Sequence, residues 1–165
     1  MARATKSNDL PVMRLLLDAG ADPTLTLKDR TTVVMIAAAG GRQVGAYVGA
    51  LPVTEASSLE AIKLCVERGV DVRAFNTSGE TALHIAAARG ADNIVRFLVE
   101  KGAGLGVKNK RGQTPLDAVA NGGARGRGVG RGGVGRESST AALLRELMAQ
   151  RGIPVPPTRD TTPSQ

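Results

Sequence analysis

The sequence predicts an all-α solenoid of about four helix–turn–helix repeats, joined by short hairpin turns and interrupted by two inserted loops. Three observations lead to this prediction. Motif positions recur at a separation of 33 residues, aromatic residues make up only 2% of the 165 residues, and apolar residues recur at helical spacing in short segments that end in glycine. Small apolar side chains suit closely stacked helices, and a helix with a single apolar face needs a neighbour to cover it.

The repeats emerge when the segment that begins at Gly79 is aligned with the segment that begins at Gly112. The matched pairs at this separation are Thr81 and Thr114, Leu83 and Leu116, Ala87 and Ala120, Ile62 and Val95, and Gly69 and Gly102. Two other copies are displaced by 49 to 50 residues, since residues 31–41 match 80–90 and residues 142–152 resemble 94–102. The excess of about 16 residues predicts one insertion in the second repeat and one in the fourth.

The predicted domain spans residues 1–152, with repeats at about 1–25, 26–75, 76–108 and 109–152. The insertions fall at about 42–57 and 122–138, and the proline-containing tail 153–165 is expected to be disordered. The first repeat has only a stub of its first helix. We therefore expect its second helix to lack a neighbour on one side, and association with another molecule through this incomplete repeat is a further expectation.

Threonine begins the first helix of a repeat, and glycine ends it. Thr81 precedes ALHIAAARG, where its hydroxyl can accept a hydrogen bond from a free backbone amide, and Gly90 stops the helix. In the second helix, Asp92 and Asn93 are the capping candidates. Its apolar face is formed by Ile94, Val95, Leu98 and Val99.

Polar stretches such as FNTSGE and KNKRGQ separate the helix pairs and predict hairpin turns. Gly79 and Gly112 hold equivalent positions in two of these turns, and Arg30 holds that position in the first. A left-handed backbone is unfavourable for arginine, so we expect the first hairpin to be irregular.

These motifs resemble the ankyrin repeat, which has a T-P-L-H-x-A-like start to its first helix and a second helix that ends in G-A-D. The sequence has TALHIAA at 81–87, TPLDAVA at 114–120, TVVMIAA at 32–38, GAD at 20–22, GVD at 69–71 and GAG at 102–104. It also resembles the C-terminal part of bacterial ankyrin-repeat proteins that carry an insertion within a repeat. The resemblance implies a non-catalytic module that binds a partner protein through its hairpin tips and its concave helix face.

Mapped onto this sequence, the resemblance implies a set of candidate partner-binding residues at the hairpin tips and on the first helices. They are Lys28, Asp29, Thr77, Ser78, Ala88, Arg89, Lys108, Lys110 and Arg111. The last hairpin carries three of the positive charges, so an acidic patch on the partner is expected. The alternative interpretation of these charges is solubility alone.

A glycine- and arginine-rich tract at 122–136 suggests a second function class, a nucleic-acid-associated protein. The tract contains four arginines and no acidic residue, so it supplies over half of the net charge of +7. These arginines could contact phosphates: Arg125, Arg127, Arg131 and Arg136. The tract is short and has no aromatic residue on which a base could stack. A loop between two helices is the favoured interpretation, so we do not expect nucleic acid as the main partner.

The first insertion is almost uncharged and apolar. We expect it to fold back over its own repeat and to bury Val44, Val48 and Leu51, and the alternative is an exposed apolar loop that docks a partner. A third interpretation of the whole chain is a structural piece that completes a longer ankyrin solenoid.

The sequence indicates no enzyme, metal or cofactor. There is one cysteine and one histidine, and two G-x-G-x-x-G matches within the glycine tract are expected by chance. We expect His84 to hydrogen-bond turn backbone and Cys65 to be a small buried apolar residue. Without an apolar N-terminal segment or a long apolar stretch, we expect a soluble protein, with no indication of its compartment.

Overall fold

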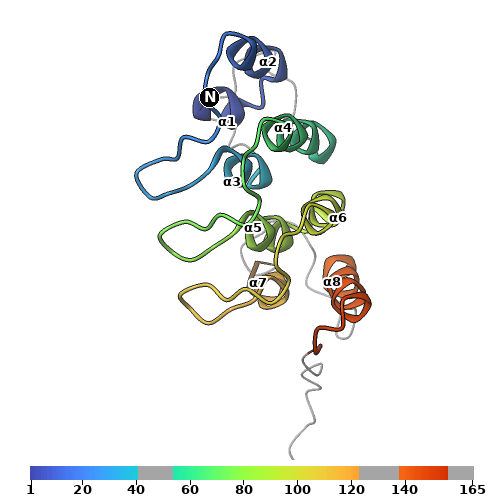
Figure 1. Ribbon diagram of the computed structural model, residues 1–165. Helices are drawn as coiled ribbons and strands as arrows, with labels where there is room; N and C mark the ends of the chain where they lie inside the picture. The colour runs from blue at the N-terminus through green and yellow to red at the C-terminus, as the bar shows by residue number, and fades with distance from the viewer. Residues whose placement is uncertain (41–53, 123–137, 156–165) are drawn as a thin grey trace, which may run out of the picture.

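The computed structural model describes residues 1–40, 54–122 and 138–155. These residues form helices in two layers (Figure 1). The first layer contains α1 (Ala2–Ser7), α3 (Val33–Ala38), α5 (Ala82–Arg89) and α7 (Pro115–Gly122), and the second contains α2 (Leu10–Asp18), α4 (Glu55–Glu67), α6 (Asp92–Glu100) and α8 (Ser139–Gln150). The predicted all-α class is confirmed, since the described residues include no strand beyond one isolated bridge between Phe75 and Thr81.

Helices of one layer stack on the helices of the same layer in the neighbouring repeats. The first-layer contacts run from α1 to α3, α5 and α7, and the second-layer contacts run from α2 to α4, α6 and α8. The three connections between repeats extend as hairpins from the side opposite the second layer (Figure 1). Together the two layers enclose one continuous apolar core along the length of the solenoid.

The core is built from small and medium apolar side chains. The apolar face predicted for α6 is confirmed, because Ile94, Val95, Leu98 and Val99 are all buried. Cys65 is also fully buried, and burial raises the pKa of its thiol to about 11. That cysteine therefore behaves as an apolar core residue, as the sequence predicts.

Threonine precedes three of the four first-layer helices, α3, α5 and α7, as predicted, whereas α1 follows Met1 and has no side-chain cap. The Thr32 hydroxyl accepts a hydrogen bond from Met35 N (3.2 Å), and the Thr81 hydroxyl accepts one from His84 N (3.4 Å). The Thr114 hydroxyl accepts the equivalent bond from Asp117 N (3.3 Å). These contacts satisfy amides that have no partner within their own helix.

The prediction that Asp92 or Asn93 caps α6 is wrong. The N-cap residue of α6 makes no side-chain capping bond. Instead, Glu55 Oε1 in α4 accepts hydrogen bonds from the backbone amides of Asn93 (2.7 Å) and Ile94 (3.4 Å). The Asp92 carboxylate accepts a hydrogen bond from the Thr140 hydroxyl in α8. A helix of the preceding repeat therefore caps α6, because α4 begins early enough to reach it.

Helix α4 is longer than α6 at its N-terminal end. It has 13 residues against nine, and both helices end at matching glutamates, Glu67 and Glu100. Residues 55–57 of its first turn lie inside the predicted insertion 42–57, so the inserted sequence contributes most of an extra helical turn. Residues 42–53 of that insertion, including Val44, Val48 and Leu51, lie outside the described residues. So do most of the second insertion and the tail beyond residue 155.

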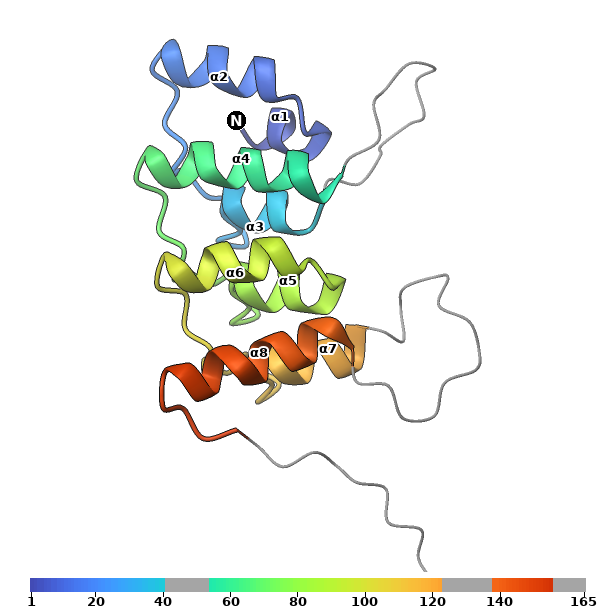
Figure 2. The same ribbon diagram turned by 90° about the vertical axis from the view of Figure 1, so that its right-hand side faces the viewer.

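Figure 2 shows that α3 and α7 end, and α4 and α8 begin, at one edge of the solenoid. The two helices of the second repeat and the two helices of the fourth repeat therefore meet the predicted insertions at the same edge of the solenoid. At the N-terminal end, two apolar residues of α2 are accessible, since Val12 is 40% exposed and Leu15 is 68% exposed. No helix among the described residues has the length and apolar character needed to cross a membrane.

Candidate functional site

The three hairpins have the same backbone structure. In each hairpin, one residue closes the turn with two backbone hydrogen bonds. Its carbonyl accepts from the amide three residues later, and its amide donates to the carbonyl four residues later, with N···O distances of 2.8–3.0 Å. Leu27 pairs in this way with residues 30 and 31, Asn76 with 79 and 80, and Asn109 with 112 and 113. The fourth residue of each turn has a left-handed backbone, with φ of 62° at Arg30, 74° at Gly79 and 73° at Gly112. The expected irregularity of the first hairpin is therefore wrong, because Arg30 adopts the conformation that glycine adopts in the other two.

Neighbouring hairpins are joined by backbone hydrogen bonds. Thr77 N donates to the carbonyl of Asp29 (2.9 Å), and Lys110 N donates to the carbonyl of Ser78 (3.0 Å). Each bond connects the tip of one hairpin to the tip of the next. The three tips therefore form one continuous strip along the solenoid, which we call the hairpin strip (residues 27–31, 76–80 and 109–113).

Asparagine side chains stabilise the second and third turns. Asn76 Oδ1 accepts hydrogen bonds from Ser78 N (2.9 Å) and Glu80 N (3.0 Å), and Asn109 Oδ1 accepts the equivalent pair from Arg111 N (2.9 Å) and Gln113 N (3.0 Å). An asparagine oxygen that accepts from amides further along the chain is a common way to fix a tight turn. These bonds hold the tip backbone in one conformation.

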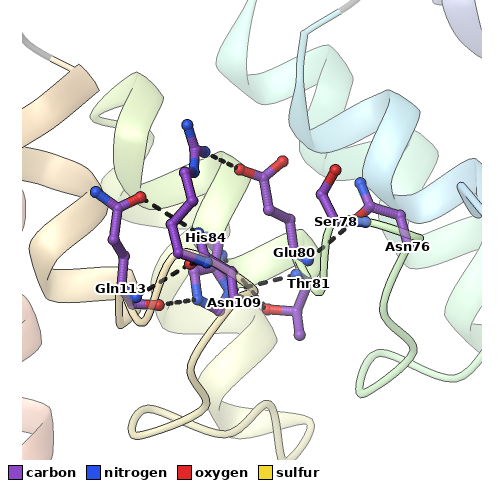
Figure 3. A network of polar contacts seen from close by, with 8 residues as sticks. Asn76, Ser78, Glu80, Thr81, His84, Asn109 and Gln113 are labelled. Atoms are coloured by element: carbon purple, nitrogen blue, oxygen red, sulfur yellow. Dashed lines mark hydrogen bonds and ion pairs between the residues drawn. The ribbon is translucent and has the colours of Figure 1, made fainter.

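His84 in α5 connects the third repeat to the third hairpin, which begins the fourth repeat (Figure 3). Its Nε2 lies 3.0 Å from the carbonyl of Gln113, and its Nδ1 lies 2.9 Å from the Thr81 hydroxyl. A carbonyl only accepts, so the neutral ring carries its hydrogen on Nε2 and accepts at Nδ1. Burial lowers the pKa of His84, against a smaller opposing effect of the Gln113 carbonyl. The predicted structural role of His84 is confirmed.

Six of the nine candidate residues lie on the hairpin strip, and all six are exposed: Lys28, Asp29, Thr77, Ser78, Lys110 and Arg111. Lys108 is exposed beside the third hairpin, Ala88 is half-buried in α5, and Arg89 is exposed at the end of α5. The structure thus brings the tip residues together in one strip, while the two α5 residues lie at the end of a helix in the first layer.

Three of these nine side chains take part in contacts within the fold. The Asp29 carboxylate accepts a hydrogen bond from Thr31 N at 3.1 Å. Arg111 Nη2 donates to Glu80 Oε1 at 2.7 Å, so this arginine pairs with the preceding hairpin. Arg89 Nη1 donates to the carbonyl of Ala38 at 3.5 Å, and its guanidinium packs where a side chain at Gly40 would collide with it. Lys108 and Lys110 form no ion pair with any described residue.

Between the second and third hairpins lies a groove of about 480 Å³ that the sequence analysis did not include. It is lined by Arg30, Phe75, Asn76, Thr77, Gly79, Val107, Lys108, Asn109 and Lys110. Phe75 is 50% exposed and Val107 39% exposed, although both are large apolar side chains. Their placement within otherwise polar hairpin segments is the signal in the sequence that could have identified them.

The four arginines proposed for nucleic acid, Arg125, Arg127, Arg131 and Arg136, lie outside the described residues. In the described part of the chain, no group of three His, Cys, Asp or Glu side chains is placed to hold a metal ion. The arrangement that the structure does present is an exposed strip of hairpin tips on a repeating helical scaffold.

Comparison with known proteins identifies the family. Residues 66–118 match the family model described as ankyrin repeats (many copies). The chain is 36% identical over 107 residues, or 64% of its length, to the ankyrin repeat and KH domain-containing protein mask of Drosophila melanogaster, and 44% identical over 62 residues, or 38% of its length, to the B-cell lymphoma 3 protein homolog of Mus musculus. It is also 37% identical over 62 residues, again 38% of its length, to protein phosphatase 1 regulatory subunit 27 of Homo sapiens.

The fold and these matches define a helical-repeat protein, and its residues 66–118 are identified as ankyrin repeats. The matched regions span 2%, 14% and 40% of the three relatives named above. Repeats of this family are typically non-catalytic interaction modules, and the matches support a protein–protein interaction module in this chain.

Proposed function

We propose that the chain binds a partner protein through the hairpin strip and the adjoining ends of the first-layer helices. The proposed contacts are the nine candidate residues: Lys28, Asp29, Thr77, Ser78, Ala88, Arg89, Lys108, Lys110 and Arg111. The observation that carries this proposal is the contrast between the backbone and the side chains of the hairpins. Their backbone groups are hydrogen-bonded within and between turns, whereas most of their tip side chains are exposed.

A fixed backbone with exposed side chains favours binding for a physical reason. Ordering a flexible loop on binding opposes association, so a surface whose backbone is already fixed loses less conformational entropy. The side chains on such a surface can vary without disturbing the scaffold. A rigid strip with free side chains is therefore well suited to recognise a protein surface.

The charges at the third hairpin support a partner with an acidic surface. Lys108 and Lys110 are exposed and carry no ion pair among the described residues, and Arg111 shares its charge with Glu80. Exposed charges of one sign steer an oppositely charged partner and contribute to specificity. Raising the salt concentration should therefore weaken binding.

The test is affinity capture with the full chain, followed by mass spectrometry, with and without nuclease. We compare the wild type with the Lys108→Glu, Lys110→Glu double variant. The matched control is Lys63→Glu, Arg96→Glu, which reverses two exposed charges on the second-layer helices α4 and α6. We expect the hairpin variant to lose the partner and the control to retain it, with nuclease having no effect.

Two results would contradict the proposal. Equal capture by the wild type and the hairpin variant would move the binding surface away from the third hairpin. Loss of all captured protein on nuclease treatment would favour the nucleic-acid alternative that rests on the glycine- and arginine-rich tract. Circular dichroism of each variant checks that the helices are intact.

A further inference from the structure

We propose that the groove between the second and third hairpins binds one apolar side chain of a linear peptide whose flanking residues are acidic. This inference rests on the proposed function, since it names the kind of segment by which the partner docks. It is carried by the apolar residues that line the groove, by the cations around it, and by the conformation of one arginine.

Two large apolar residues that line the groove are accessible. Phe75 is half exposed and Val107 is 39% exposed, and both line the same space of about 480 Å³. That volume lies within the usual range of ligand sites, which is about 300–1,000 Å³. A single aliphatic or aromatic side chain would cover both residues and remove their apolar surface from water.

The lining of the groove carries positive charge. It includes Arg30, Lys108 and Lys110 and no acidic residue. The nearest acidic groups on the strip already have partners, because Glu80 pairs with Arg111 and the Asp29 carboxylate accepts a hydrogen bond from Thr31 N (3.1 Å). Carboxylates on both sides of an apolar residue would complement this arrangement.

Arg30 is the third observation. It has φ of 62° in a turn position where the other two hairpins have glycine, so the fold itself has no need of a side chain there. Its guanidinium lies over the Phe75 ring, 5.1 Å from the ring centroid. A strained backbone that holds a cation against the apolar lining of a groove is consistent with a binding role.

The groove fits a peptide better than a nucleic acid. Base recognition along a single strand uses several aromatic platforms in succession, and this groove has Phe75 alone. One apolar position with cations around it matches a single anchor residue with acidic neighbours. Single-stranded RNA therefore serves as a competing probe in the test.

The test measures binding of fluorescein-labelled peptides to the full chain by fluorescence anisotropy. The main probe has a central leucine flanked on both sides by aspartates, and the matched probes replace the leucine by serine or the aspartates by lysines. Oligouridine is the nucleic-acid probe. We expect the leucine–aspartate peptide to bind at least about tenfold more tightly than any other probe, a difference that corresponds to one well-buried apolar side chain.

Matched variants locate the site. Leu25 occupies in the first hairpin the position that Val107 occupies in the third, and it is 70% exposed outside the groove. We expect Val107→Ser to weaken binding of the main probe about tenfold and Leu25→Ser to leave it unchanged. Arg30→Gly removes the cation and relieves the backbone strain, so it should fold at least as well as the wild type and yet bind more weakly.

The inference is overturned if the leucine and serine peptides bind equally, if oligouridine binds best, or if Val107→Ser and Leu25→Ser behave alike. These results are distinguishable from failure of the proposed function. Should the peptide fail while the Lys108→Glu, Lys110→Glu variant still loses its captured partner, the hairpin strip remains the binding surface and only the groove is excluded.

Discussion

His84 illustrates how one side chain can fix two repeats at once. Its backbone amide bonds the Thr81 hydroxyl within its own helix start, and its ring reaches the Gln113 carbonyl of the next hairpin. The equivalent residue of the fourth repeat is Asp117, whose carboxylate accepts from Thr114 N at 2.8 Å. An acidic residue therefore suffices for the local cap, and the His84 imidazole in addition reaches the neighbouring repeat.

We predict that the free energy of unfolding decreases as the pH falls from 7 to 5. Burial lowers the pKa of His84 in the folded state. The unfolded chain then takes up a proton first, at a pKa of about 6.5, so stability is full above that value and is lost below it. Urea unfolding of the wild type and of His84→Gln at both pH values checks this. Since the chain has one histidine, the variant should show little change, and a flat wild-type profile would exclude the buried neutral imidazole.

Two glycines with the same backbone conformation should respond differently to alanine. Gly79 and Gly112 have φ of 74° and 73°. A Cβ at Gly79 would lie 3.0 Å from Lys110 N and 3.2 Å from Asn109 Cα, whereas a Cβ at Gly112 would meet no described atom within 4 Å. Gly112→Ala should cost about 1 kcal/mol through strain alone, and Gly79→Ala clearly more, because the third hairpin must move. Urea unfolding measures both, and equal losses would contradict the close packing of the two hairpins.

At the scale of the helix, several of the described helix ends receive hydrogen bonds from a neighbouring repeat in addition to the local caps. Glu55 of α4 caps the start of α6, Arg68 Nη1 donates to the carbonyl of Leu17 at the end of α2 (3.2 Å), and Arg151 donates to the carbonyl of Val99 at the end of α6. Helices of six to 13 residues are marginal in isolation. Each repeat therefore depends on its neighbours both for its apolar face and for its terminal backbone groups.

We predict that Glu55→Ala lowers the free energy of unfolding by about 1 kcal/mol, which is typical for loss of a helix cap. The control is Glu60→Ala in the same helix. Glu60 makes an exposed ion pair with Arg14 at 4.0 Å, and its loss should change stability by less than about 0.5 kcal/mol. Denaturant unfolding of the two variants gives the comparison. Equal effects would show that the hydrogen bonds to Asn93 and Ile94 add nothing.

At the scale of the whole molecule, periodicity was sufficient to predict the helix pairs and the place of the hairpins. The 33-residue spacing reflects a local pattern of caps, apolar faces and glycines, which a sequence displays directly. The Glu55 cap could not be found in this way, since its partner Asn93 lies 38 residues away. Nor could the left-handed Arg30, because residue preference alone favours an irregular turn.

The candidate site was predictable in the same degree. The tip residues follow from the hairpin positions, and the structure gathers six of them on one strip. The groove between hairpins depends on how far two turns are separated in space, and no spacing in the sequence encodes that distance. Phe75 and Val107 were visible only as apolar residues in polar segments.

The central claim is that the partner binds to the hairpin strip and not to the second layer of helices. The most direct measurement is the change in backbone amide chemical shifts when the captured partner is added to the ¹⁵N-labelled chain. We expect the largest changes in residues 27–31, 76–80 and 109–113 and near Ala88 and Arg89. Changes concentrated instead on the exposed side of α2, α4, α6 and α8 would contradict the account.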